Sequence, residues 1–222
     1  MNSAVIITAA GSSSRMGNRI KKEYLILNGR SILSMAITPF VETGLFSNFV
    51  VTVPPGGEEA ARRSLVGTGF EEMIIFQEGG ETRQHSVFKG LLVLESRKPE
   101  YVLIHDGARP WVTRELIVEV LKKSEEYNAC IPVVPPLDAI KTVDESGFIV
   151  SHLDRKNIRC AQTPQGFRYR DILEAHRKAS TDGKEYPDDS EVYCTYCGRV
   201  AAISGDPANR KITFVFDLGG AR

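Results

Sequence analysis

The sequence predicts an α/β fold with a mainly parallel, twisted sheet and helices on both of its faces. Short apolar runs of strand length alternate with segments in which apolar residues recur at helical spacing. This alternation extends from residue 5 to residue 134. Strands that alternate with helices form parallel sheets, and ligands bind beyond the carboxyl ends of such strands. We therefore expect the functional site at that edge of the sheet.

The elements of the alternating part follow one another closely. Pro39 falls inside the first helical pattern and is expected to bend or end that helix. Thr113 is a suitable N-cap for the last helix, because its hydroxyl can accept a hydrogen bond from the first turn. The predicted strands are residues 5–7, 49–53, 73–76, 101–104 and 129–134. The predicted helices are residues 32–41, 58–65, 82–94 and 113–127.

The alternation breaks after residue 136. Residues 137–160 contain two short alternating segments around a polar turn, which predicts a β-hairpin. A hairpin inserted into an α/β domain either covers the site or contacts a second subunit. The remaining chain predicts a turn at 163–166, helices at 169–178 and 188–197, a strand at 200–203 and an extended segment at 211–216. We expect one domain, residues 1–222, with the hairpin as a protruding arm.

Composition argues against several classes of protein. The 28 Lys and Arg residues balance the 28 Asp and Glu residues, so we expect binding neither to nucleic acid nor to an anionic membrane. No apolar run approaches the length of a membrane span, and residues 1–3 lead into the first strand without a signal-peptide pattern. A cytoplasmic protein is expected. Cys194 and Cys197 have C-x-x-C spacing, but no second pair completes a zinc site, and ordinary thiols are expected.

The first predicted strand leads into a loop of small residues that includes Ala9, Ala10 and Gly11. Backbone N–H groups in such a loop can face an anion, and the cations Arg15 and Lys22 beyond it could hold a polyphosphate. The loop matches neither the Walker A pattern nor G-x-G-x-x-G. A plain strand-to-helix turn also explains the small residues, whereas the cations favour an anion site.

Asp106 follows the fourth predicted strand, at the same edge of the sheet as the first loop. Mg²⁺ prefers one or two carboxylates together with phosphate oxygens, so a carboxylate here could hold the ion beside bound phosphates. Alternatively, Asp106 caps the turn or pairs with Arg109. The neighbouring His105 is expected to pack beneath the site.

Three further segments carry residues of interest. Residues 79–86 form a glycine-rich turn that could present backbone amides and Ser86 to a base or ribose, or simply cap a helix. Arg155 lies on the returning limb of the hairpin, and Lys211 lies near the end of the chain. Each is an ordinary solvated cation unless the fold brings it to the edge that holds Asp106.

Taken together, these segments resemble those of one enzyme family. The stretches ITAAGSSSRMG, GGETRQHSVFKGL, HDGARPWV, DRKNIRCAQTPQGF and NRKIT occur in this order across essentially the whole chain. The ordered set closely resembles the 2-C-methyl-D-erythritol 4-phosphate cytidylyltransferases of non-mevalonate isoprenoid synthesis. The resemblance implies a Rossmann-like nucleotidyltransferase fold and a homodimer formed through the arm at about 137–160. It also implies transfer of a cytidylyl group from CTP to a sugar phosphate, with Mg²⁺ as cofactor.

The resemblance assigns roles to individual residues. Arg15 and Lys22 match residues that stabilise the transition state, and Asp106 matches the aspartate on the metal side. Arg155 and Lys211 match residues that position the attacking phosphate, with Arg155 reaching into the partner's site. Positions that match contacts to the nucleotide, besides Arg15 and Lys22, are Ala9, Ala10, Gly11, Gly80, Glu81, Ser86 and Ala108. Arg109 is expected near the sugar phosphate.

Two departures from the family pattern concern the sugar. Ala139 and Pro187 stand where substrate-contacting threonines are often found. The nearest alternative is therefore a cytidylyltransferase for another polyol phosphate, such as ribitol 5-phosphate. A non-catalytic nucleotide-binding regulatory protein is disfavoured because all the matched cations and Asp106 are retained. A dinucleotide-dependent oxidoreductase is disfavoured because G-x-G-x-x-G is absent.

Overall fold

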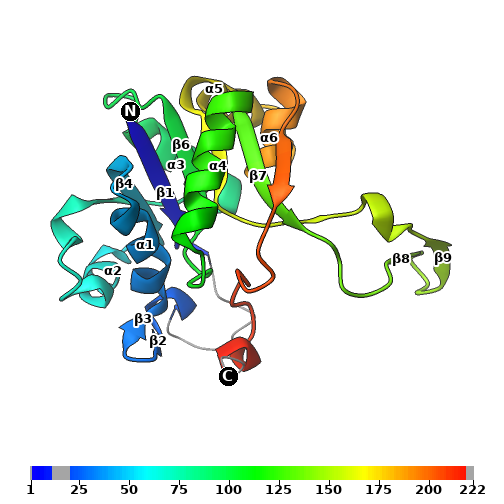
Figure 1. Ribbon diagram of the computed structural model, residues 1–222, viewed down its shortest axis with the longest axis horizontal. Coiled ribbons are helices and arrows are strands. Elements are labelled where there is room, and N and C mark those ends of the chain that lie inside the picture. Colours follow the sequence, from blue (N-terminus) through cyan, green and yellow to red (C-terminus); the bar gives the residue numbers. More distant parts are fainter. Residues whose placement is uncertain (1, 12–20, 219–222) are drawn as a thin grey trace.

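The computed structural model describes residues 2–11 and 21–218, and it has the predicted α/β architecture (Figure 1). In the described residues, the central sheet has eight strands, and two small sheets have two strands each. The strands of the central sheet are β1 (Ser3–Thr8), β4 (Phe46–Val53), β5 (Ile74–Glu78), β6 (Tyr101–Asp106), β7 (Ala129–Val134), β10 (Cys160–Ala161), β11 (Gln165–Arg168) and β12 (Ala201–Ser204).

The order of the strands predicts where a ligand binds. The sheet runs β5-β4-β1-β6-β11-β7-β10, and β12 also pairs with β7. Strands β5, β4, β1 and β6 are parallel, whereas β11 lies antiparallel between β6 and β7. The chain leaves β1 toward β4 and later returns to β6 on the other side of β1. Such a reversal opens a crevice at the carboxyl ends of β1 and β6, where Thr8 and Asp106 are register partners.

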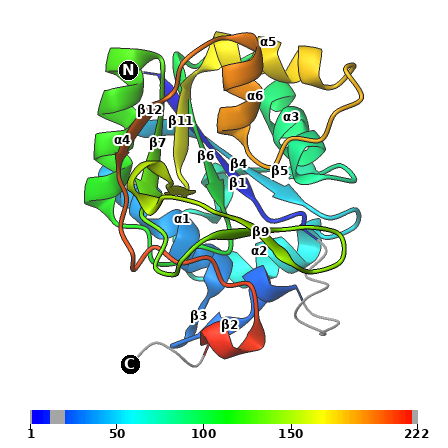
Figure 2. The same cartoon turned by 90° about the vertical axis from the view of Figure 1, so that its right-hand side faces the viewer.

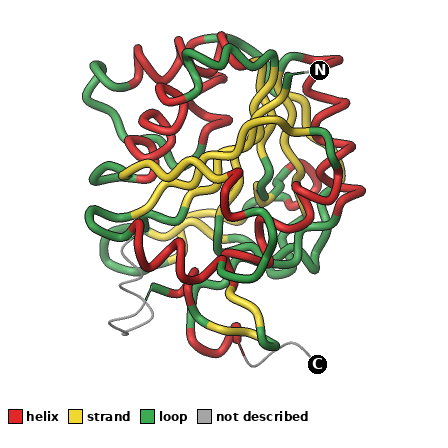
Figure 3. Tube along the Cα trace, turned by 90° about the vertical axis from the view of Figure 1, so that its left-hand side faces the viewer, coloured by secondary structure: helices red, strands yellow, loops and turns green. Residues whose placement is uncertain are grey.

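Two apolar layers hold the helices against the sheet. In β1, Val5 and Ile7 face one layer, while Ala4 and Ile6 face the other, because side chains alternate along a strand. Helices α1 (Ile32–Thr43), α2 (Glu58–Leu65) and α4 (Arg114–Tyr127) cover the first layer, and α3 (Arg83–Val93), α5 (Tyr169–Ala179) and α6 (Asp189–Tyr196) cover the second. Figures 2 and 3 show the twisted sheet between these helices. None of the helices in the described part of the chain is long and apolar enough to cross a membrane.

The helix boundaries agree with the prediction to within two residues, and of the two expectations for Pro39, that it ends the helix is wrong. Thr113 caps α4 as expected and accepts a hydrogen bond from the backbone N–H of Leu116 at 3.3 Å. Helix α1 does not end at Pro39 but continues to residue 43. Ile37 and Phe40 are fully buried, so packing of this face against the sheet outweighs the loss of one backbone hydrogen bond.

The predicted turn at 163–166 is wrong in its second half. Gln165 and Gly166 belong to β11, which pairs with both β6 and β7. A Cβ atom on Gly166 would lie 2.2 Å from Oγ of Ser124 in α4. The glycine therefore allows a helix to approach the strand closely, whereas in the sequence it resembles a turn residue.

The extended segment expected at 211–216 is wrong at its end, because residues 215 and 216 belong to a helix. The segment curls into a short 3-10 helix, Val215–Leu218. The Asp217 carboxylate accepts hydrogen bonds from the backbone N–H groups of Thr213 at 2.7 Å and Phe214 at 2.8 Å, which turns the chain back on itself. The other short elements in this half of the molecule are the 3-10 helices Lys22–Tyr24 and Glu71–Met73 and the strands β2 (Ile26–Leu27) and β3 (Arg30–Ser31).

The predicted hairpin is present and projects from the body of the molecule (Figure 1). It consists of β8 (Lys141–Val143) and β9 (Ile149–His152), which pair in antiparallel fashion. The Asp144 carboxylate closes the connecting turn by accepting hydrogen bonds from the backbone N–H groups of Ser146 and Phe148. The hairpin is thus an ordered arm outside the packed core.

Candidate active site

A cleft of about 690 Å³ opens at the carboxyl ends of β1, β4 and β6, where the sheet topology predicts a ligand site. The predicted site residues that line it are Ala10, Gly11, Lys22, Gly80, Glu81, Ser86, Asp106, Ala108 and Lys211. Ala9 is fully buried just after the end of β1, and Arg109 contacts Asp106 from below. Arg155 lies in the arm, and Arg15 lies outside the described residues.

The first loop is fixed at both of its described ends. The backbone N–H of Ala9 donates to the carbonyl oxygen of Thr52 at 2.9 Å, which holds the loop against β4. Lys22 is only 8% exposed, and its Nζ donates to the carbonyl oxygen of Ile212 at 2.7 Å. A buried ammonium group needs such oxygens to replace water. Lys22 therefore connects the first loop to the C-terminal segment.

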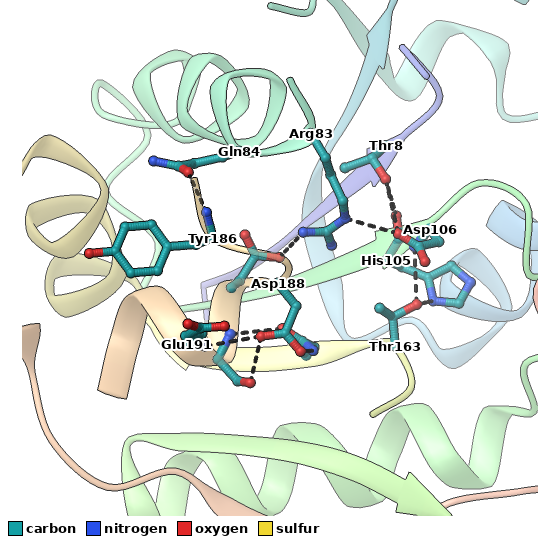
Figure 4. Close-up of polar contacts among 12 residues, drawn as sticks. Thr8, Arg83, Gln84, His105, Asp106, Thr163, Tyr186, Asp188 and Glu191 are labelled. Carbon is teal, nitrogen blue, oxygen red and sulfur yellow. Dashed lines mark hydrogen bonds and ion pairs between the residues drawn. The ribbon is translucent and has the colours of Figure 1, made fainter. Parts of the chain in front are cut away.

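Asp106 is surrounded by three cations. Its Oδ2 lies 2.8 Å from Nζ of Lys211 and 3.5 Å from Nε of Arg109. Its Oδ1 lies 3.2 Å from Nε of Arg83 and accepts a hydrogen bond from the Thr8 hydroxyl at 3.3 Å (Figure 4). The fold has thus brought Lys211 to Asp106, and the alternative pairing of Asp106 with Arg109 is present as well.

These cations decide the charge of the Asp106 carboxyl. Burial alone would raise its pKa, because the charged form loses contact with water. Lys211, Arg83 and Arg109 outweigh this effect and hold the pKa of Asp106 well below its usual range. The group is therefore ionised at neutral pH. Because Arg83 also pairs with Asp189, the cluster has three cations and two carboxylates, and its one net positive charge favours an anionic ligand.

Two residues that contribute to this cluster were not found from the sequence. Arg83 is the first residue of α3, and its Nη1 lies 2.8 Å from Oδ2 of Asp189 at the start of α6. Oδ1 of Asp189 lies 3.2 Å from Nε2 of the buried His176. A cation in the first turn of a helix is unfavourable because it opposes the helix dipole. The position of Arg83 in the sequence therefore indicated that acidic partners compensate for this cost.

The glycine-rich turn at 79–86 begins a helix and also lines the cleft. The Gly80 N–H donates to Oγ of Ser86 at 3.0 Å, and the Ser86 hydroxyl contacts the Thr82 carbonyl oxygen at 2.9 Å. A Cβ atom on Gly79 would lie 2.5 Å from Cβ of Ala10, so only glycine lets this turn reach the first loop. The turn is therefore both a helix start and a wall of the cleft.

His105 packs beneath the site, as expected. It is fully buried, with Nδ1 2.9 Å from Oγ1 of Thr163 and Nε2 3.1 Å from the carbonyl oxygen of Arg109. Burial lowers the pKa of His105 to about 4, so the imidazole is neutral at physiological pH. Its contacts are structural: they hold the strand end that carries Asp106.

The C-terminal segment is attached to the site by hydrogen bonds of its backbone with Ala108 and Arg109. The N–H of Ile212 donates to the carbonyl oxygen of Ala108 at 2.8 Å. Nη1 of Arg109 donates to the carbonyl oxygen of Asn209 at 2.7 Å. These contacts place Lys211 beside Asp106, although the two residues are distant in the sequence.

Arg155 does not line the cleft of its own chain. It lies in the short 3-10 helix Arg155–Asn157 of the arm, is exposed, and donates from Nη1 to the carbonyl oxygen of Leu137 at 2.8 Å. The structure of one chain therefore brings Lys22, Asp106 and Lys211 together and leaves Arg155 apart from them.

The donors in the cleft fit a magnesium ion that is shared with a ligand. In the described ranges, no group of three or more His, Cys, Asp or Glu residues could hold a metal ion by itself. Asp106 nevertheless supplies an ionised carboxylate, and Mg²⁺ takes few protein carboxylates when phosphates supply further oxygens. Lys211, whose side chain is 37% exposed, has room to move away from Oδ2.

The cysteines of the C-x-x-C pair lie on the outside of the protein. Cys194 and Cys197 are both free and exposed, in α6 and at its end. The Cys197 thiol contacts the carbonyl oxygen of Asp171 at 3.3 Å. Neither cysteine lines the cleft.

A doubly wound sheet whose cleft gathers cations and glycine-rich turns around one ionised carboxylate is typical of α/β proteins that bind phosphorylated nucleotides. Comparison with known proteins gives a narrower assignment. The model of the 2-C-methyl-D-erythritol 4-phosphate cytidylyltransferase family matches residues 3–222. The chain belongs to this family.

Individual relatives agree with the assignment. The 2-C-methyl-D-erythritol 4-phosphate cytidylyltransferase of Caldanaerobacter subterraneus is 37% identical over 219 residues, which cover 98% of this chain and 96% of that protein. The crystal structure of the Thermus thermophilus cytidylyltransferase has 32% identity and a TM-score of 0.81, with 99% of this chain and 96% of that chain covered. A bifunctional enzyme IspD/IspF of Bradyrhizobium is 39% identical over 212 residues, or 95% of this chain. The chain spans about half the length of the bifunctional relatives, 53% in this case.

Proposed function

We propose that the chain transfers the cytidylyl group of CTP to 2-C-methyl-D-erythritol 4-phosphate, in the biosynthesis of isoprenoid precursors. An oxygen of the sugar phosphate attacks the α-phosphorus of CTP, and the bond from that phosphorus to the pyrophosphate oxygen breaks. The products are 4-diphosphocytidyl-2-C-methyl-D-erythritol and pyrophosphate. The observation that carries the proposal is the meeting of Lys22, Asp106 and Lys211 in one cleft of a chain that belongs to this family.

The residues of the cleft act by position and charge. Two polyanions must approach each other for an in-line displacement, and little covalent chemistry is required of the protein. Lys22 and Lys211 offset the repulsion between the two phosphates, and Lys22 stabilises the charge that develops during transfer. The first loop offers backbone N–H groups to the triphosphate, and the turn with Gly80, Glu81 and Ser86 holds the nucleoside.

Asp106 is the residue that would hold Mg²⁺. When bound, the ion would neutralise phosphate oxygens and favour departure of the pyrophosphate. Arg109, whose Nε lies 3.5 Å from Oδ2 of Asp106, would contact the sugar phosphate. Lys211 lies 2.8 Å from Asp106 and can turn to the same phosphate.

We further propose that the active enzyme is a cytoplasmic homodimer joined through the arm. Apolar side chains of the arm such as Phe148 are exposed in a single chain, which supports a second copy as partner. Arg155, which is distant from the cleft of its own chain, would then contact the sugar phosphate in the partner's cleft.

The proposal is tested by incubating the purified chain with CTP, Mg²⁺ and a panel of sugar phosphates while pyrophosphate release is measured. Release with 2-C-methyl-D-erythritol 4-phosphate is the expected result. Ala139 and Pro187 lack the hydroxyl groups expected for sugar recognition, so ribitol 5-phosphate belongs in the panel. Preferential turnover of ribitol 5-phosphate would replace the proposed substrate. No release with any member of the panel would reject the transferase function.

A further inference from the structure

Arg83 joins Asp106 to a second buried carboxylate that the proposed mechanism does not use. Its Nε lies 3.2 Å from Oδ1 of Asp106, and its Nη1 lies 2.8 Å from Oδ2 of Asp189. The Asp189 side chain is 1% exposed, and His176 occupies its other oxygen at 3.2 Å. Figure 4 shows Arg83 reaching across the site to Asp106. Asp106 is thus connected, through one guanidinium group, to a carboxylate that is fixed on both oxygens.

The position of Arg83 is unfavourable without these partners. As the first residue of α3 it opposes the dipole of its own helix. Burial alone would lower the pKa of Arg83, but Asp189 and Asp106 raise it overall. The two carboxylates therefore stabilise the buried charge of Arg83.

The geometry also fixes how Arg83 approaches Asp106. A guanidinium is planar, so the contact between Nη1 and Asp189 determines the direction in which Nε points. Nε and the Thr8 hydroxyl hold Oδ1 of Asp106, and Oδ2 faces Lys211. Because the Arg83 guanidinium also interacts with the Asp189 carboxylate, its positive charge does not act on Asp106 alone.

We propose that Arg83 is a positioning residue. Locked by Asp189, it holds the Asp106 carboxylate in the orientation that receives a divalent cation and the substrate phosphates. The inference rests on the proposed function, since it assigns the cation to Asp106. It adds Asp189, from a different helix, as the residue that sets the orientation of Arg83.

The test is to titrate Mn²⁺, a spectroscopic substitute for Mg²⁺, into the full chain in the presence of CTP. Arg83→Lys keeps a positive charge but cannot reach two carboxylates with a fixed plane. Mn²⁺ affinity should fall about 10- to 100-fold, the usual effect of removing a group that orients a metal ligand. The Mg²⁺ concentration needed for half-maximal pyrophosphate release should rise by a similar factor.

Asp189→Asn tests whether Asp189 acts through Arg83. It keeps the shape of the side chain and removes the charge, so Mn²⁺ affinity should fall about tenfold. In the double variant with Arg83→Lys, the loss should be smaller than the product of the two single losses, because both changes break one connection. Asp188→Asn is the matched control, because Asp188 caps the same helix by accepting a hydrogen bond from the Glu191 N–H at 3.0 Å. This variant should bind Mn²⁺ with the affinity of the unmodified chain.

The outcomes separate the two proposals. Unchanged Mn²⁺ affinity in both Arg83→Lys and Asp189→Asn, with the melting temperature of the unmodified chain, would overturn the positioning role. Multiplicative losses in the double variant would overturn the role of Asp189. If the unmodified chain binds Mn²⁺ and CTP but releases no pyrophosphate with any sugar phosphate, the proposed function fails while the titration still decides the role of Arg83.

Discussion

At the scale of single residues, the lysines of the cleft are held by oxygens of the protein itself. Lys22 donates to the carbonyl of Ile212, and Lys211 contacts the carboxylate of Asp106. A phosphorylated ligand offers oxygens of the same kind, so each lysine can exchange one oxygen partner for another. The charges are in place before the ligand arrives, and little reorganisation is required during the reaction.

The first prediction concerns Lys22. Replacing it by Ala removes a cation whose contact should strengthen as negative charge develops on the triphosphate. We expect kcat/KM for pyrophosphate release to fall about a hundredfold or more, the scale of losing one preorganised donor. Lys122→Ala, on the exposed surface of α4, is the control and should leave the rate unchanged. Near-normal turnover by a folded Lys22→Ala variant would remove Lys22 from the mechanism.

The second prediction concerns Asp106 and the metal. Asp106→Asn preserves the shape of the side chain but removes the charge that would hold Mg²⁺. Activity should fall sharply, and the remaining activity should require more Mg²⁺. Because the pKa of Asp106 lies well below its usual range, the carboxylate of the unmodified protein stays charged from about pH 6 to 8. The ratio of the two activities should therefore be constant over this interval. An unchanged Mg²⁺ titration curve would return Asp106 to the role of a turn residue.

At the scale of elements, the success of sequence prediction follows the length and the pattern of each segment. Strands such as β1 and β4 contain runs of apolar residues, and α4 has a cap and a clear helical period, so each could be predicted from its own residues. Strand β11 has only four residues, and Gly166 gives it the appearance of a turn. Its place in the sheet is decided by pairing with β6 and β7, which no local pattern reveals.

The third prediction tests whether α4 packs closely on β11 at Gly166. Gly166→Ala would place a Cβ atom 2.2 Å from Oγ of Ser124 and 3.0 Å from Cγ1 of Val120. Forcing a methyl group into this contact should lower the free energy of unfolding by about 1–3 kcal/mol. Urea unfolding measures the effect. Combining it with Ser124→Ala removes the nearest atom, so the double variant should lose less than the sum of the single changes. Full stability of Gly166→Ala would show that α4 does not pack tightly on β11.

At the scale of the whole molecule, sequence could predict only those site residues that lie at the ends of strands of the central sheet. The first loop follows β1 directly and Asp106 is the last residue of β6, so the parallel topology places them together. Arg83 and Asp189 are 106 positions apart, and their pairing depends on the packing of α3 and α6 on one face. The place of Arg83 in the first turn of its helix indicates an acidic partner, but nothing in a single sequence indicates which residue that partner is. The role of Arg155 depends on a second chain and stays a prediction.

The exposed surface of the arm indicates a second chain. Several apolar residues of the arm are exposed on a single chain, among them Val143 (61%), Phe148 (72%), Val150 (60%) and Leu153 (42%). Ile140, just before β8, is partly buried. An apolar surface of this kind on a projecting hairpin favours a partner, and the same hairpin of a second copy would cover it symmetrically. Each active site would then contain residues of two chains.

The last prediction follows from that arrangement. Arg155→Ala and Lys22→Ala should each be almost inactive as separate dimers, because every site lacks one cation. In a mixed dimer, the cleft that retains Lys22 receives the intact Arg155 of the other subunit. Free exchange in an equal mixture should restore about a quarter of the sites, since half of the dimers are mixed and each has one complete site. Pyrophosphate release measures the recovery, and native mass spectrometry shows whether mixed dimers have formed. Mixed dimers without activity would mean that Arg155 acts within its own chain or not at all.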